Sequence, residues 1–173
     1  MADAADLIRL GVWYSSAGRS GLLSTFLMVV VDAEAPPSAI GKYKTVCKIG
    51  NGLDAVTQTM ISTKLLRAME PVKNRKCPPW LSCRASYLPD MLMRDPSEAD
   101  VMEIIGAEIS VSQIHTAGIF LRFPRIWCLQ PDKCSAAVST LQELHHLLSV
   151  SGNKVAQSFQ GEDPTCGEWK YFN

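Results

Sequence analysis

Residues 22–32 read LLSTFLMVVVD and carry the strongest strand signal in the chain. Their nearly continuous hydrophobicity predicts a strand that is covered on both faces. Residues 6–14 are also strand-like because they are rich in β-branched, aliphatic and aromatic side chains, and residues 43–49 alternate polar with apolar side chains. The stretches at 15–21 and 33–41 are short and rich in turn-forming residues. We therefore expect the three strands to form a meander.

A helix is expected directly after this meander. Apolar side chains recur at helical spacing between positions 53 and 69, with Asn51 as the N-cap and Pro71 as the terminator. A fourth strand is expected at residues 101–109, with Gly106 near its centre, and a fifth at residues 119–123.

The order of these elements predicts a mainly β fold. Five strands with a helix between the third and the fourth are typical of the OB-fold, a small and partly open barrel. A short amphipathic helix is expected at residues 139–150. We therefore predict a five-stranded OB-fold barrel with an inserted helix and a short C-terminal helix over residues 1–150, followed by a tail of unknown role at residues 151–173.

Composition limits the classes of protein to consider. A chain of 173 residues with 47% apolar side chains forms one domain with a real core and is not disordered. A net charge of zero argues against a generic nucleic-acid binder. The charges are uneven, however: residues 1–76 hold ten Lys and Arg against six Asp and Glu, and residues 77–173 hold seven against eleven. This leaves room for a basic face, although scattered surface charges remain the alternative.

Neither a metal site nor a membrane segment is expected. The six cysteines are expected to be free thiols, because Cys77/Cys83 and Cys128/Cys134 are each separated by five residues, more than the usual two to four between paired zinc ligands. The longest apolar run, residues 26–31, is far shorter than the roughly 20 residues of a membrane span. The first residues lack the features of a signal peptide, so we expect a soluble intracellular protein.

Four stretches resemble one protein family, in the same order along the chain. They are ADAADLIRLG at residues 2–11, GRSGLLSTFL at 18–27, TVCKIGNG at 45–52 and VMEIIGAEISVSQIHTAGIFLRFPR at 101–125. Together they resemble the C-terminal OB-fold domain of ATP-dependent DNA ligases, and DNA ligase III in particular. The resemblance covers roughly residues 2–150, and the final Arg-Phe-Pro-Arg is its most specific part.

The resemblance implies roles for the two residues that open this Arg-Phe-Pro-Arg motif. In the family, this Arg-Phe pair lies in the minor groove at the nick, so Arg122 would contact the strand and Phe123 would press against sugars and a base step. An apolar wedge unstacks a base step, and an arginine favours the negative potential of a narrow groove. The alternative is that Phe123 is the last core residue of its strand and Arg122 a surface cation.

Further basic residues are candidates for contacts to DNA phosphates. Arg125 closes the signature, and Arg19, Lys42, Lys44 and Lys48 lie on or beside the first three strands. If these side chains share a face, they would bind the DNA backbone without reading its sequence. Each of them is also compatible with an ordinary solvated surface position.

The chain departs from the family after Arg125. Two arginines of the family's terminal motif are replaced by Cys128 and Gln130, while Asp132 and Lys133 match its final pair. In the family, this motif orients the ATP triphosphate, whose leaving pyrophosphate requires cationic groups. The match implies a catalytic role for Asp132 and Lys133, and the missing arginines weaken it; an ordinary surface lysine is the alternative for Lys133.

The adenylated lysine of the family is also missing. No Lys-x-Asp-Gly sequence occurs in the chain, so the chain alone is expected neither to adenylate itself nor to hold a cofactor. The resemblance implies that the complete ligase uses ATP and Mg²⁺, with a nucleotidyltransferase domain in cis or in trans. It also implies nicked double-stranded DNA as the partner, DNA strand joining in repair and recombination as the process, and the nucleus or the mitochondrion as the location. The alternative is a degenerate, non-catalytic OB module that binds a protein partner.

Overall fold

The computed structural model describes residues 3–14, 23–50, 52–133 and 137–155, with the backbone alone at residues 151–155. The expected meander is confirmed: β1 (Asp3–Tyr14) pairs antiparallel with β2 (Leu23–Val31), which pairs antiparallel with β3 (Tyr43–Ile49). The side chains of β2 from Phe26 to Val30 are all buried, as a strand covered on both faces requires.

The central sheet extends beyond the meander on both sides. Its strand order is β10-β7-β1-β2-β3-β5, where β7 is Val101–Gly106, β10 is Arg125–Gln130 and β5 is Leu81–Ser82. Two short strands, β4 (Met69–Pro71) and β6 (Met91–Met93), pair with each other, and β6 also pairs with β1.

A separate two-stranded sheet and three single-turn helices complete the described strands and turns. The small sheet consists of β8 (Ile109–Val111) and β9 (Ile119–Leu121). The 3-10 helices are η1 (Lys73–Arg75), η2 (Ala85–Tyr87) and η3 (Pro96–Glu98).

Both expected helices are present, with shifted ends. Helix α1 (Ala55–Ala68) begins after Asp54, whose carboxylate accepts a hydrogen bond from the backbone N–H of Thr57 at 2.9 Å. Asp54 is therefore the N-cap, and the prediction of Asn51 was wrong, because only a side chain at the helix end reaches these unpaired N–H groups. Helix α2 (Leu141–Val155) begins two residues after the expected start and continues past residue 150.

Two of the expected strands have different limits. The strand predicted at residues 101–109 is divided after Gly106, where a Cβ atom would lie 2.9 Å from the backbone oxygen of Arg122. The strand predicted at residues 119–123 ends at Leu121, and β10 was not predicted as a strand. The two ends lie together in the fold, because the backbone N–H of Ala107 donates to the Arg122 carbonyl at 2.8 Å.

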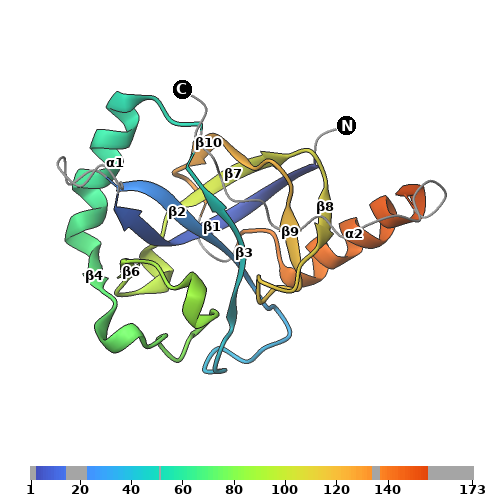
Figure 1. Ribbon diagram of the computed structural model, residues 1–173, viewed down its shortest axis with the longest axis horizontal. Helices are drawn as coiled ribbons and strands as arrows, with labels where there is room; N and C mark the ends of the chain where they lie inside the picture. Colours follow the sequence, from blue (N-terminus) through green and yellow to red (C-terminus); the bar gives the residue numbers. More distant parts are fainter. Residues whose placement is uncertain (1–2, 15–22, 51, 134–136, 156–173) are drawn as a thin grey trace.

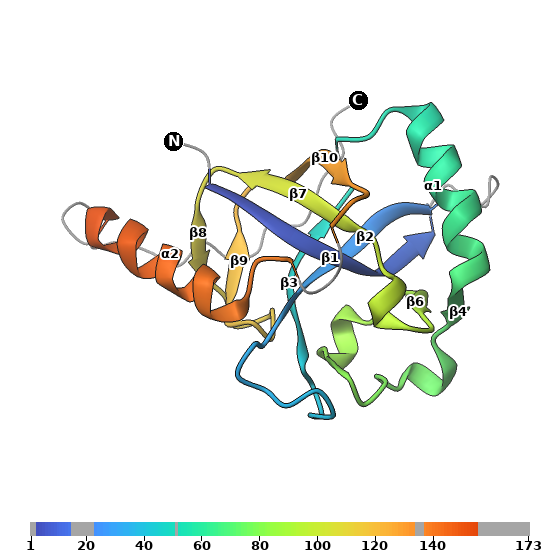
Figure 2. The same ribbon diagram turned by 180° about the vertical axis from the view of Figure 1, so that it is seen from behind.

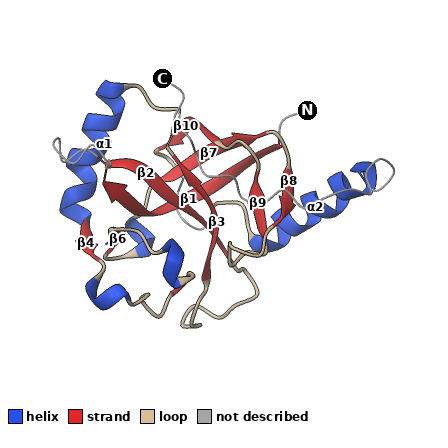
Figure 3. Cartoon of the chain, viewed as in Figure 1, coloured by secondary structure: helices blue, strands red, loops and turns tan. Residues whose placement is uncertain are grey.

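The large sheet curls around a buried core, with α1 beside one of its ends and α2 beside the small sheet (Figures 1 and 2). The predicted fold class is confirmed: a mainly β, OB-like domain with two helices (Figure 3). The core is apolar and draws on most of the strands and on both helices; it includes Leu7, Leu10, Phe26, Met28, Ile49, Leu65, Met102, Ile104, Leu121 and Leu144. Within the described residues, no helix is both long enough and apolar enough to cross a membrane.

Candidate functional site

The link between β9 and β10 presents an aromatic side chain to solvent. Phe123 is 70% exposed and has φ = +50°, in the left-handed region that bulky residues rarely adopt. Such a conformation costs on the order of 1–3 kcal/mol, and residues held this way cluster at functional sites. Phe123 is therefore not the last core residue of a strand, and that alternative is excluded.

Arg122 is held beside this phenylalanine. Its guanidinium Nη1 lies 2.5 Å from Glu108 Oε1, and its backbone N–H donates to the Glu108 carbonyl at 2.9 Å. The backbone N–H of Ala107 donates to the Arg122 carbonyl at 2.8 Å. The guanidinium carbon is 5.6 Å from the centre of the Phe123 ring. Glu108 thus pairs with a half-exposed cation that lies next to an exposed aromatic ring.

Strand β10 adds two more exposed side chains. Arg125 is its first residue and is exposed. Trp127 is 62% exposed and was not among the predicted site residues. It lies at a register shift between β10 and β7, which a single sequence does not reveal.

The other predicted basic residues are divided between two places. Lys48, near the C-terminal end of β3, is exposed, and its Nζ lies 4.1 Å from the centre of the Trp13 ring. Lys44, near the start of β3, lies close enough to Asp32 to contribute to the lowered pKa of that carboxyl, which the hydrogen bond from Gln142 lowers most. Arg19 lies outside the described residues.

The turn that follows β3 packs against β10. A Cβ atom on Gly52 would lie 2.4 Å from the backbone oxygen of Ile126. The C-terminal end of β3 therefore approaches the start of β10, where Arg125 lies. Arg122, Phe123 and Arg125 lie in the segment that leads from β9 into β10. Lys48 is near the end of β3 whose turn approaches β10, with its ammonium group on the Trp13 ring, whereas Lys44 lies toward the other end of β3.

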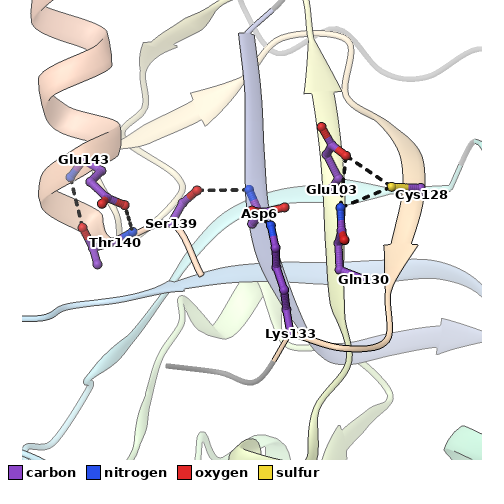
Figure 4. Close-up of polar contacts among 8 residues, drawn as sticks. All are labelled: Asp6, Glu103, Cys128, Gln130, Lys133, Ser139, Thr140 and Glu143. Atoms are coloured by element: carbon purple, nitrogen blue, oxygen red, sulfur yellow. Dashed lines mark hydrogen bonds and ion pairs between the residues drawn. The ribbon is translucent and has the colours of Figure 1, made fainter. Parts of the chain in front are cut away.

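The residues that replace the two family arginines fasten β10 to β7. The Cys128 thiol and the Gln130 side-chain amide both donate to Glu103 Oε2 at 3.2 Å, and Gln130 also contacts Cys128 Sγ at 3.4 Å (Figure 4). The pKa of Cys128 is raised, chiefly by its hydrogen bond to Glu103. These neutral groups satisfy a carboxylate of the same domain.

Lys133 is also engaged within the domain. Its ammonium group forms an ion pair with Asp6 in β1, and this contact raises the pKa of Lys133 (Figure 4). The backbone N–H of Asp6 donates to Ser139 Oγ at 3.0 Å, and Asp132 is exposed. Asp6 lies directly opposite Glu103 in the pairing of β1 with β7.

The surface formed by Glu103, Asp6, Cys128, Gln130 and Lys133 does not fit a bound triphosphate. Among the described residues, it presents the neutral groups of Cys128 and Gln130 next to the carboxylates of Glu103 and Asp6, and the ammonium group of Lys133 is already paired with Asp6. A polyanion requires several unpaired cationic groups. In the part of the chain that the structure describes, no three His, Cys, Asp or Glu residues are grouped as metal ligands.

A second exposed feature lies on α1, which carries the exposed side chains of Val56 and Met60 along a shallow groove. The groove is also lined by Thr63, Lys64 and Arg67. Of the described tryptophans, Trp127 is exposed, whereas Trp13 and Trp80 are half-buried and pack on Tyr87 and Tyr43. These tryptophans do not form one exposed patch.

Comparisons with known proteins identify relatives for this arrangement. No protein-family model matches the chain. Over 146 residues, or 83% of the chain, it is 38% identical to DNA ligase 3 of Dictyostelium discoideum, and over 148 residues it is 37% identical to the DNA ligase of monkeypox virus. The chain is homologous to the C-terminal region of DNA ligases. It spans 12% of the Dictyostelium ligase and 25% of the monkeypox virus ligase.

Solved ligase structures share the fold. The ligase domain of LigD from M. tuberculosis matches 80% of this chain with a TM-score of 0.58, at 16% identity and over 38% of its own length. A mycobacterial DNA ligase D complexed with ATP and MES matches with a TM-score of 0.54 over the same shares of both chains. At this identity, the likeness concerns the fold of the ligase-related domain alone.

Proposed function

We propose that this chain is the nick- and duplex-binding OB-fold domain of an ATP-dependent DNA ligase of the DNA ligase III type. It grips double-stranded DNA at a nick while a nucleotidyltransferase domain, in the same chain or in a separate one, carries out the adenylate chemistry with ATP and Mg²⁺. Strand joining in DNA repair and recombination, in the nucleus or the mitochondrion, is the process to which it contributes.

One observation carries the proposal: the exposed Phe123 ring in a left-handed backbone, next to the ion-paired Arg122. A soluble domain gains nothing in stability from an exposed aromatic ring in a strained conformation. A side chain that inserts at a base step has to project from the protein surface in this way. An arginine beside it can lie in the minor groove, where the potential is negative. Arg125 and Lys48 add positive charge for phosphates without reading bases.

The geometry supports DNA binding more strongly than ATP handling. Asp132 and Lys133 are proposed as catalytic from the family match alone, and Lys133 would first have to leave Asp6. A protein-binding module was the alternative from the sequence. Homology to DNA ligases does not favour it.

Fluorescence anisotropy with a labelled nicked duplex tests the proposal. The wild-type chain should bind with an affinity that falls steeply with salt, and Phe123→Ala and Arg122→Ala should each weaken binding by about tenfold or more. Ile40→Ala is the matched control, because Ile40 is also a strongly exposed apolar side chain, at 87% against 70% for Phe123, and lies in the loop before β3. Binding that is insensitive to salt, or equal in all four proteins, would rule out the proposed grip.

A further inference from the structure

Strand β10 carries a bulge at its exposed tryptophan. Ile126 pairs with Ile104 and Cys128 with Glu103, so Trp127 is one residue more than β7 can match. A bulge re-aims a side chain and bends its strand, and bulges are over-represented next to functional sites. Trp127, which is 62% exposed, therefore sits at a bulge in the edge strand of the central sheet.

The surroundings hold this bulge in place from two sides. On one side, Gly52 has φ = +109°, and its missing side chain lets the turn after β3 come against the backbone of Ile126. On the other side, the bonds of Cys128 and Gln130 to Glu103 fasten the rest of the strand to β7. These contacts on both sides fix the backbone position of Trp127.

Within five residues, the chain alternates an exposed aromatic, an exposed cation and a second exposed aromatic: Phe123, Arg125 and Trp127. An aromatic ring stacks on sugars and bases of any sequence, and a guanidinium group pairs with a phosphate. This combination suits the backbone of a nucleic-acid strand better than an apolar protein surface, which would have to desolvate the arginine.

We propose that Trp127 is a second aromatic contact to duplex DNA, separated from Phe123 by a phosphate contact of Arg125. The proposal rests on the proposed function and extends it. Four residues of chain span at most about 13 Å, which corresponds to roughly four base pairs at 3.4 Å per step. Trp127 therefore meets the DNA within about four base pairs of the wedge formed by Phe123.

The test uses anisotropy and intrinsic tryptophan fluorescence with a nicked duplex. Trp127→Ala should weaken binding by about tenfold, whereas Trp127→Phe, which keeps a ring, should stay within about threefold of the wild type. Nicked DNA should change the emission of the wild-type chain more than that of Trp127→Phe. A thermal melt by circular dichroism checks that each variant is folded.

The outcomes separate this inference from the proposed function. If Phe123→Ala loses affinity while Trp127→Ala binds as the wild type does, Trp127 is not a DNA contact and the inference is overturned, although the proposed grip stands. If neither substitution changes binding, the proposed function fails as well. If Trp127→Ala leaves DNA binding intact but abolishes self-association in sedimentation, Trp127 contacts protein, and the inference is also overturned.

Discussion

Two arginine–carboxylate pairs in this domain have the same chemistry and opposite surroundings. Arg9 is 0% exposed and pairs with Asp100, whereas Arg122 and Glu108 are 42% and 40% exposed. Burial lowers the pKa of Arg9 to about 10, against the opposing effect of Asp100. A buried pair cannot lose one partner without leaving an uncompensated charge, whereas an exposed pair contributes about 0–1 kcal/mol and is screened by salt.

The contrast in burial indicates which of the two arginines is accessible to a ligand. Arg9 is surrounded by the core, and its guanidinium lies 5.3 Å from the centre of the Phe26 ring. Its Nε and Nη1 have no hydrogen-bond partner among the described residues, so Asp100 is the contact that compensates its charge. Arg122, in contrast, can exchange Glu108 for a phosphate at little cost. Residue type alone does not distinguish the two.

The largest loss of stability is expected when the pair between Arg9 and Asp100 is broken. Asp100→Ala leaves the Arg9 charge without its carboxylate and should lower the free energy of unfolding by about 3–5 kcal/mol, measured by urea denaturation. Lys64→Ala is the control, because Lys64 contacts the same carboxylate from a largely exposed position and should cost less than about 1 kcal/mol. Equal, small losses in both variants would mean that the buried pair does not support the fold.

The second largest loss of stability is expected where the turn between β3 and α1 packs against β10. In Gly52→Ala, the new Cβ meets the backbone of Ile126 at 2.4 Å, in a conformation that L-residues rarely adopt. We expect a loss of about 1–3 kcal/mol in the free energy of unfolding and weaker binding to nicked DNA, because β10 shifts. Gly50→Ala is a milder control, since its nearest contact is 3.3 Å away. An unchanged melting temperature in Gly52→Ala would contradict the close packing.

Replacement of Phe123 by asparagine should have opposite effects on stability and on binding to nicked DNA. Asparagine tolerates the left-handed region better than phenylalanine does, so Phe123→Asn should raise the free energy of unfolding by up to about 1 kcal/mol while it weakens binding to nicked DNA. Phe123→Ala should weaken binding without this gain. A loss of stability in Phe123→Asn would show that the ring packs against the domain.

The smallest effect on stability is expected at the exposed pair. Glu108→Gln should change the free energy of unfolding by less than about 1 kcal/mol and strengthen binding to nicked DNA at low salt, because a negative charge beside the phosphates is removed. Arg122→Ala should reduce the slope of affinity against salt by about one phosphate contact. If Glu108→Gln weakened binding, Glu108 would be needed to position Arg122 and would not compete with the phosphates.

Part of the fold followed from local patterns. The nearly continuous apolar run of β2 and the alternation in β3 predicted their strands to within a residue. The helical spacing before Pro71 predicted α1, although its N-cap is Asp54. These features are local, because strand and helix periodicity are properties of neighbouring residues along the chain.

The mainly β class, the meander and the position of the Arg-Phe-Pro-Arg segment could be predicted from the residues alone. The display of that segment could not: the turn after Gly106, the left-handed Phe123, the bulge at Trp127 and the different burial of Arg9 and Arg122 come from the folded chain. Each of these features depends on a partner far along the chain. Exposure, register and ion pairing are set by what the fold places opposite a residue, and a local pattern carries no record of that partner.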